Sequence, residues 1–155
     1  MNSQSQVEMH SNGSRKLHHV GFVLASIEKN AAAFASFLGA TWNENIIFDP
    51  LQKVRVTFLK GAHAEDCLFE LVEPAGDDSP VSRFLAGGGG LHHICYEVAD
   101  LESEIEFCKA TGAILVRPPV PAVAFGGRRI AWMRTIPRLR PGLLVELLEG
   151  SKTSS

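Results

Sequence analysis

An internal repeat constrains the fold of this chain more than any other feature. The segments "LHHVGFVLASIE" (17–28) and "LHHICYEVADLE" (91–102) both begin with a leucine and two histidines and continue as apolar, strand-like runs. Each run leads into a stretch with helical spacing of its apolar residues, and Ser26 and Asp100 stand where N-caps are expected. The repeat therefore predicts two similar modules in tandem.

The remainder of each module consists of short segments rich in β-branched and aromatic residues, which predict strands. In the first module these are "NIIF" (45–48), "KVRVTFLK" (53–60) and "DCLFELVEP" (66–74). In the second they are "AILV" (113–116), "RRIAWM" (128–133) and "GLLVELLEG" (142–150). The predicted order is βαβββ twice, so the predicted fold class is α+β, with two tandem modules whose curved sheets surround a shared cleft.

The chain is expected to form one domain with unstructured ends. The expected boundaries are a domain at 16–150, made of module one at 16–74, a linker at 75–90 and module two at 91–150. In the linker, Ser79 followed by Pro80 predicts the start of a short helix, and the glycines at 87–90 predict a flexible joint. The polar ends, 1–15 and 151–155, are predicted to be a disordered leader and tail.

Charge and composition argue against several classes of function. The net charge is −2 with no long basic run, so nucleic-acid binding has no electrostatic support. No apolar run approaches the roughly 20 residues that a membrane span needs, and the start of the chain lacks the apolar core of a signal peptide. The three cysteines do not make a disulfide framework. We therefore expect a cytoplasmic protein with reduced thiols.

Alternation along the predicted strands separates the two histidines of each pair. Successive side chains of a strand point to opposite faces, and His18 shares its face with apolar residues that pack under the helix. His19 is therefore expected to face the cleft. The same count in the second module directs His93 to the cleft and His92 to the packed face.

The same reasoning directs one glutamate of each module inward. Glu70 and Glu146 each interrupt an apolar strand, and burying an isolated carboxylate costs several kcal/mol. A divalent metal would compensate that charge, and two imidazoles with two carboxylates suit Co, Zn, Ni, Mn or Fe. The alternative is that the histidines are strand-start residues and the glutamates are solvated. Because the set recurs in register, we favour a metal site formed by His19, Glu70, His93 and Glu146.

Several of these segments resemble a known group of proteins. "LHHVGFVL", "SPVSRFLAGGGGLHHICYEV", "FGGRRIAWM" and "GLLVELLEG" are similar to the vicinal oxygen chelate superfamily, and most of all to methylmalonyl-CoA epimerases, over roughly residues 16–150. The resemblance places that family's metal ligands on the four residues named above. It implies one divalent metal ion, a small-molecule substrate such as a CoA or carrier-protein thioester, and a homodimer.

One position departs from the epimerase pattern. Epimerases use a second carboxylate on the third strand of the first module, and that position falls near Val56 in this chain. The residues left as catalytic bases are Glu70 or Glu146, or Glu97 on the same predicted face as His93. Basic residues expected to hold an anionic part of the substrate are Arg55, Arg128 and Arg129.

These observations lead to a predicted reaction and its alternatives. The predicted protein is a metal-dependent isomerase or epimerase that polarises a carbonyl and promotes transfer of an α-proton, on an acyl thioester such as a methylmalonyl-type substrate. The alternatives are a glyoxalase-type lyase, an extradiol-type dioxygenase and a non-catalytic small-molecule binding protein. Deuterium exchange, oxygen uptake with catechols and metal content separate these alternatives.

Overall fold

The computed structural model describes residues 14–135 and 142–151. Its strands are β1 (Lys16–Val23), β2 (Thr41–Trp42), β3 (Ile47–Asp49), β4 (Val54–Lys60), β5 (Leu68–Pro74), β6 (Gly90–Val98), β7 (Ile114–Pro121), β8 (Arg129–Arg134) and β9 (Leu144–Glu149). Its helices are α1 (Ile27–Leu38), α2 (Ser82–Ala86) and α3 (Leu101–Ala110), with a short 3₁₀ helix, η1 (Val123–Phe125).

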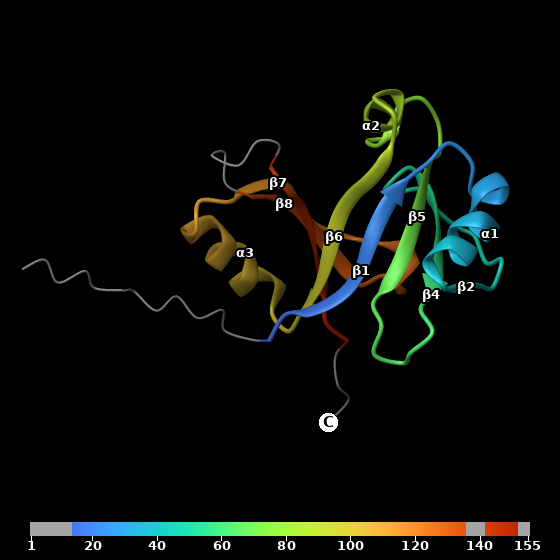
Figure 1. The fold of residues 1–155 in the computed structure, drawn as a ribbon. Helices are drawn as coiled ribbons and strands as arrows, with labels where there is room; N and C mark the ends of the chain where they lie inside the picture. The colour runs from blue at the N-terminus through green and yellow to red at the C-terminus, as the bar shows by residue number, and fades with distance from the viewer. Residues whose placement is uncertain (1–13, 136–141, 152–155) are drawn as a thin grey trace, which may run out of the picture.

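The strands form one continuous, curved sheet with the two modules side by side (Figure 1). The order is β2-β4-β5-β1-β6-β9-β8-β7, and β3 pairs with β4. The first strands of the modules, β1 and β6, run antiparallel at the centre, and each has the last strand of its own module beside it in parallel, β5 or β9. The predicted α+β duplication is confirmed, with the difference that pairing of β1 with β6 joins the two expected sheets into one.

The local signals that start the two long helices are the predicted ones. The side chain of Ser26 accepts a hydrogen bond from the backbone N–H of Lys29, and Asp100 does the same for Ser103. Gly39 ends α1 in the left-handed conformation. In the linker, Ser79 lies in a turn and α2 begins only at Ser82, two residues later than the Ser-Pro signal suggests.

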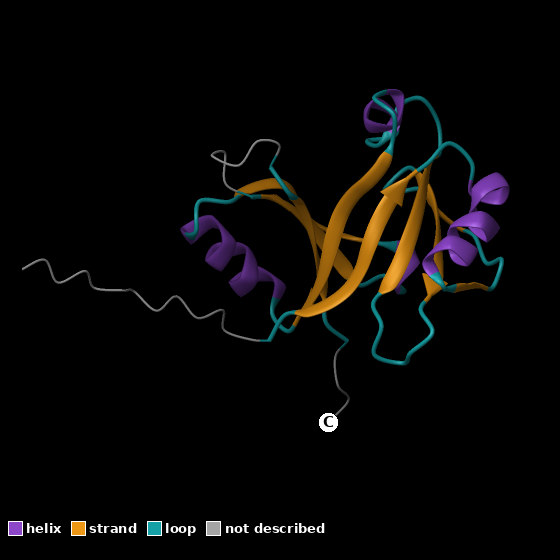
Figure 2. Cartoon of the chain, viewed as in Figure 1, coloured by secondary structure: helices purple, strands orange, loops and turns teal. Residues whose placement is uncertain are grey.

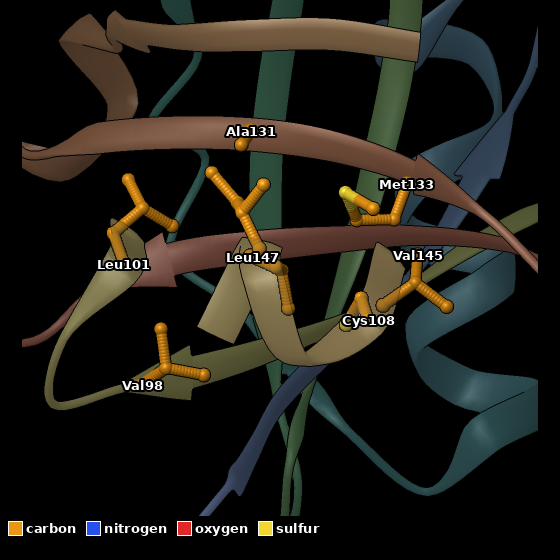
Figure 3. Close-up of a cluster of buried hydrophobic side chains, with 8 residues drawn as sticks. Val98, Leu101, Cys108, Ala131, Met133, Val145 and Leu147 are labelled. Atoms are coloured by element: carbon orange, nitrogen blue, oxygen red, sulfur yellow. The ribbon is translucent and has the colours of Figure 1, made fainter. Parts of the chain in front are cut away.

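The two long helices cover the outer side of the sheet, one in each module (Figure 2). Beneath α3, a cluster of apolar side chains joins the helix to β8 and β9; Leu147 lies in the middle of this cluster and Leu101 at its edge (Figure 3). Beneath α1, a second cluster contains Ile27, Leu59 and Leu71. Because these clusters occupy the outer side, the side chains on the inner side are left to form the site.

The ends of the predicted domain fall close to the ends of the described residues. Most of the predicted leader and tail lie outside those residues. Arg15, which was assigned to the leader, contacts α3, where its guanidinium pairs with the buried carboxylate of Glu104 and lies over the ring of Phe107. None of the described helices is long and apolar enough to cross a membrane.

Candidate metal centre

Four side chains from the two modules converge on the inner side of the sheet. They are His19 on β1, Glu70 on β5, His93 on β6 and Glu146 on β9. These four strands are the central, adjacent strands of the sheet, so residues far apart in the sequence meet there. All four are buried, with exposed fractions of 0–5%.

The geometry of this set is that of ligands around a centre. The Nε2 atoms of His19 and His93 lie 3.0 Å apart. Oε2 of Glu70 is 3.3 Å from Nε2 of His19 and 3.2 Å from that of His93, and Oε2 of Glu146 is 3.2 and 3.3 Å from the same atoms. All ligand atoms lie within 4.8 Å of one another. Two imidazole nitrogens and two carboxylate oxygens in this arrangement fit a divalent ion of the Zn, Fe, Co, Ni or Mn type.

The charges in this set stabilise one another. Burial alone would lower the pKa of both histidines, but the carboxylates of Glu70 and Glu146 raise the pKa of His19 and of His93 above the ordinary 6.5. Burial alone would raise the pKa of each carboxyl, but the two histidines hold both pKa values below the ordinary 4.5. Both glutamates are therefore ionised, as metal ligation requires.

The first histidine of each pair is not where strict alternation predicts it. The pairing of β1 with β6 shifts register between Leu17 and His19, and again where His92 intervenes between Leu91 and His93. Such a bulge inserts one residue into a strand and changes the direction of its side chain. The prediction that His18 and His92 face the packed side is therefore wrong.

Contacts and charge of these two histidines follow from the bulges. The ring of His92 lines the inner cavity, and that of His18 packs edge-on against Phe125, another residue of the cavity wall. Burial and the neighbouring His93 lower the pKa of His92 to about 4. Burial and the neighbouring His19 lower the pKa of His18 in the same way. Both side chains are therefore neutral at pH 7.

Aromatic rings and a thiol enclose the His19 side of the centre. The ring of Phe125 stacks on that of His19 at 5.8 Å, and Phe58 meets His19 edge-on. The sulfur of Cys95 lies within 4.8 Å of a ring nitrogen of His19, and burial raises the pKa of this thiol to about 12. His19 is therefore shielded from solvent, whereas the ring of His93 has Trp132 beside it and lines the cavity.

A cavity of about 450 Å³ adjoins the centre. Glu70, His93 and Glu146 are among the residues that line it. One wall is aliphatic and is formed by Val54, Val56, Val72 and Val81. A cavity of this size, mostly apolar with a few converging polar groups, is typical of a small-molecule site.

The predicted substrate arginines lie outside this cavity. Arg55 alternates with cavity-facing valines, so it points to the opposite face, where it pairs with Glu28 and Glu73. Arg128 and Arg129 follow the Gly126-Gly127 turn, and β8 begins at Arg129. Arg128 pairs with Glu97, and Arg129 with Glu102 and Glu149.

Glu97, the third predicted base, is not brought to the centre either. It is four residues beyond His93 on β6, a distance of about 13 Å along an extended strand. Its carboxylate is partly exposed and lies 2.8 Å from Nη1 of Arg128. The structure therefore leaves Glu70 and Glu146, among the predicted bases, as the carboxylates that line the cavity.

Other polar residues line the cavity that sequence reasoning did not single out. Arg83 of α2, Arg117 of β7 and Arg134 of β8 are among them, and Arg117 donates a hydrogen bond to Oε1 of Gln52 at 3.1 Å. Alternation along β8 from Ile130 could have identified Arg134. It could not have identified Arg117, because β7 shifts register beside that residue.

Comparison with protein families identifies the group to which the chain belongs. Residues 18–132 match the model of the glyoxalase/bleomycin resistance protein/dioxygenase superfamily. The chain belongs to this superfamily. The family membership predicted from the histidine segments is therefore confirmed.

Individual relatives within the superfamily are named as epimerases. An ethylmalonyl-CoA/methylmalonyl-CoA epimerase from Cereibacter sphaeroides is 31% identical over 134 residues, which cover 85% of this chain and 96% of that protein. The mitochondrial methylmalonyl-CoA epimerase of Dictyostelium discoideum is 29% identical over 139 residues, which cover 88% of this chain and 80% of that protein. The match extends over most of each relative.

Solved structures of other proteins share the fold. A methylmalonyl-CoA epimerase from Mycobacterium tuberculosis superposes with a TM-score of 0.73 and 23% identity, over 88% of each chain. A hypothetical protein from Bacillus halodurans gives a TM-score of 0.75 and 29% identity, over 92% of this chain and 99% of that one. The paired-module arrangement is therefore common to these proteins.

Proposed function

We propose that this protein is a metal-dependent enzyme that moves the α-proton of an acyl thioester, as an isomerase or epimerase does. The observation that carries the proposal is the buried set of His19, Glu70, His93 and Glu146, of which the last three line a cavity with mostly apolar walls. The names of the relatives, which are acyl-CoA epimerases, support the same class of substrate.

The four ligand atoms would hold one divalent ion, and that ion would polarise the thioester carbonyl and stabilise the negative charge that develops on its oxygen. Glu70 and Glu146 are the two groups we assign to the proton. In each, Oε2 is the oxygen that faces both histidines, so Oε1 is assigned to the substrate. One carboxylate comes from each module, so one takes the proton and the other returns it.

The aliphatic wall supports this division of roles. Val56 stands where epimerases carry a second acid or base, and Val54, Val72 and Val81 surround it. A valine cannot hold a proton. This wall excludes water from the α-carbon, and proton transfer is left to the two glutamates, which lie within the ligand set.

The cavity also has groups that suit an anionic substrate. Arg83, Arg117 and Arg134 line it, and none of them forms an ion pair with a carboxylate of the residues that the structure describes. Guanidinium groups bind carboxylates and phosphates with paired hydrogen bonds. This supports an acyl group with a second carboxylate, a phosphate-bearing carrier such as CoA, or both. A homodimer stays a prediction.

The test is exchange of the α-proton with solvent. Protein loaded with Co²⁺ is incubated with methylmalonyl-CoA in D₂O, and proton NMR follows loss of the α-hydrogen signal. We expect exchange in the wild type and a loss of about 10²-fold or more in Glu70→Gln and Glu146→Gln. Glu106→Gln, on the exposed face of α3, is the matched control and should keep the wild-type rate.

The outcomes separate the proposal from its competitors. Exchange abolished by Glu97→Gln but not by either buried glutamate would overturn the assignment of the base. Metal-loaded protein that exchanges no thioester of a panel, yet turns over the hemithioacetal of methylglyoxal and glutathione, would instead make the protein a lyase.

A further inference from the structure

The adjacent histidines of the two modules form two equivalent hydrogen bonds. Nδ1 of His18 lies 2.8 Å from Nδ1 of His19, and Nδ1 of His92 lies 3.0 Å from Nδ1 of His93. In both pairs the second histidine directs its Nε2 to the glutamates. We call His19 and His93, whose Nε2 atoms face the glutamates, the inner histidines, and His18 and His92 the outer histidines. In each pair the two rings therefore meet Nδ1 to Nδ1.

The chemistry of a neutral imidazole fixes which atom carries the hydrogen. A histidine that offers Nε2 to a metal ion has its lone pair there, so its hydrogen is on Nδ1. Nδ1 of His19 and His93 then donates. Nδ1 of His18 and His92 must accept, and the hydrogen of each outer ring is on Nε2.

Packing holds the outer rings in place for that role. His92 meets Phe84 edge-on at 4.7 Å and has Trp132 on another side. His18 meets Phe125 edge-on at 5.5 Å. Each outer histidine also lies at a register shift of the central strand pair, which brings it to the same side as its neighbour. The bulge and the outer histidine occur together in both modules, which indicates that the bulge serves to place the outer ring beside the inner one.

We propose that His18 and His92 are positioning residues that fix the tautomer and ring orientation of His19 and His93, so that both Nε2 lone pairs point to a divalent cation. This inference rests on the metal site of the proposed function. The two pairs differ in their surroundings. The sulfur of Cys95 lies within 4.8 Å of ring nitrogens of both His18 and His19, so His19 keeps a polar neighbour when His18 is replaced, and loss of His92 is expected to matter more than loss of His18.

The test compares a variant that loses the acceptor with one that keeps it. His92→Leu removes it, whereas Oδ1 of the side chain in His92→Asn can take the place of Nδ1. Affinity for Zn²⁺ is measured by competition with a chromophoric chelator. We expect a loss of about 10–100-fold in His92→Leu, a smaller loss in His18→Leu and substantial recovery in His92→Asn.

Nitrogen-15 NMR of the histidine rings gives a second readout that does not depend on activity. In the Zn²⁺-loaded wild type we expect hydrogen on Nδ1 of His19 and His93, and on Nε2 of His18 and His92. The control is His63→Leu, which alters a histidine in an exposed loop and should leave both measurements unchanged. Thermal unfolding of the metal-free proteins checks that each variant folds.

Failure of this proposal is distinct from failure of the metal site. If the wild type binds Zn²⁺ and folded His92→Leu binds it equally well, the positioning role is wrong and the site stands. Hydrogen found on Nδ1 of the outer rings in the loaded protein would overturn the role too. If the wild type binds no divalent ion, the proposed function fails together with the inference.

Discussion

Single residues decide the position of the ligand rings, and Gly21 is the clearest case. It lies opposite His93 in the pairing of β1 with β6, and a Cβ at this position would lie 2.0 Å from Cε1 of His93. The ring of His93 therefore occupies the space that a side chain at residue 21 would need. In the other module His19 lies opposite Cys95 instead, so the two halves of the site differ at this point.

Gly21→Ala tests that contact. The methyl group would displace the His93 ring, and we expect loss of at least tenfold in affinity for a divalent ion because one ligand is moved. Competition with a chromophoric chelator measures this affinity. Gly87→Ala is the matched control, since Gly87 has an ordinary φ of −81° and 3.4 Å to its nearest neighbour. Equal metal affinity in Gly21→Ala and the wild type would contradict the geometry.

The raised pKa values of His19 and His93 predict the pH dependence of metal binding. A metal ion must displace the protons from these rings, so affinity should rise as the pH rises from 6.5. The metal-free fold should respond in the opposite direction. A histidine pKa raised by folding contributes stability below the unfolded value, and this stability is lost as the pH rises through the folded value.

Calorimetry in two buffers of different ionisation enthalpy measures the protons released on binding. We expect net release, with urea denaturation of the metal-free protein showing lower stability as the pH rises from 6.5. Metal affinity that does not change with pH in this range would contradict the assignment of the histidines as ligands.

Among the elements, β9 contributes to the hydrophobic core with one face and to the candidate metal centre with the other. Leu147 is fully buried on the outer face, where it packs in the α3 cluster (Figure 3). The neighbouring Glu146 is on the inner face with His19, Glu70 and His93. Alternation along a strand therefore separates a residue that stabilises the fold from one that serves the site.

Leu147→Ala and Glu146→Gln should separate these roles experimentally. Leu147→Ala should reduce the free energy of unfolding by about 2–5 kcal/mol, measured in urea, because it leaves a cavity in the core. The folded fraction should still bind metal. Glu146→Gln should lose metal affinity instead. A Leu147→Ala variant that is stable but binds no metal would show that the two faces are not independent.

Much of the architecture at this scale was predictable, and the exceptions have physical reasons. Helix caps, strand alternation and the repeat are local signals, and they predicted both long helices and the convergence of His19, Glu70, His93 and Glu146. Side-chain alternation is interrupted at a bulge, so the predicted orientation of His18 and His92 was wrong. Partners are also invisible in a sequence, so the ion pairs that hold Arg55, Arg128 and Arg129 outside the cavity could not be foreseen.

At the scale of the whole molecule, residues of both modules line the cavity. Asp49 at the end of β3 accepts a hydrogen bond from the backbone N–H of Val123 in the second module, and Arg117 of that module donates to Gln52 of the first. Both contacts join the two modules beside the cavity, since Asp49, Gln52 and Arg117 are among the residues that line it. Substrate recognition is therefore expected to depend on residues of both modules.

Arg117→Met tests whether the cavity arginines bind the substrate. Loss of a hydrogen bond to a charged group costs about 1.5–3 kcal/mol, so we expect KM for the acyl-CoA to rise about tenfold or more with a smaller change in kcat. Arg129→Met is the control, because Arg129 pairs with Glu102 and Glu149 outside the cavity. An effect of Arg129→Met that equals or exceeds that of Arg117→Met would contradict the placement.

The central claim is that His19, Glu70, His93 and Glu146 together hold one divalent ion, and elemental analysis tests it most directly. Wild-type protein and His93→Ala are each reconstituted with a divalent metal, desalted and measured for metal per chain by mass spectrometry. The account predicts about one ion per chain in the wild type and its loss in the folded variant. Equal metal content in the two proteins, or none in the wild type, would contradict it.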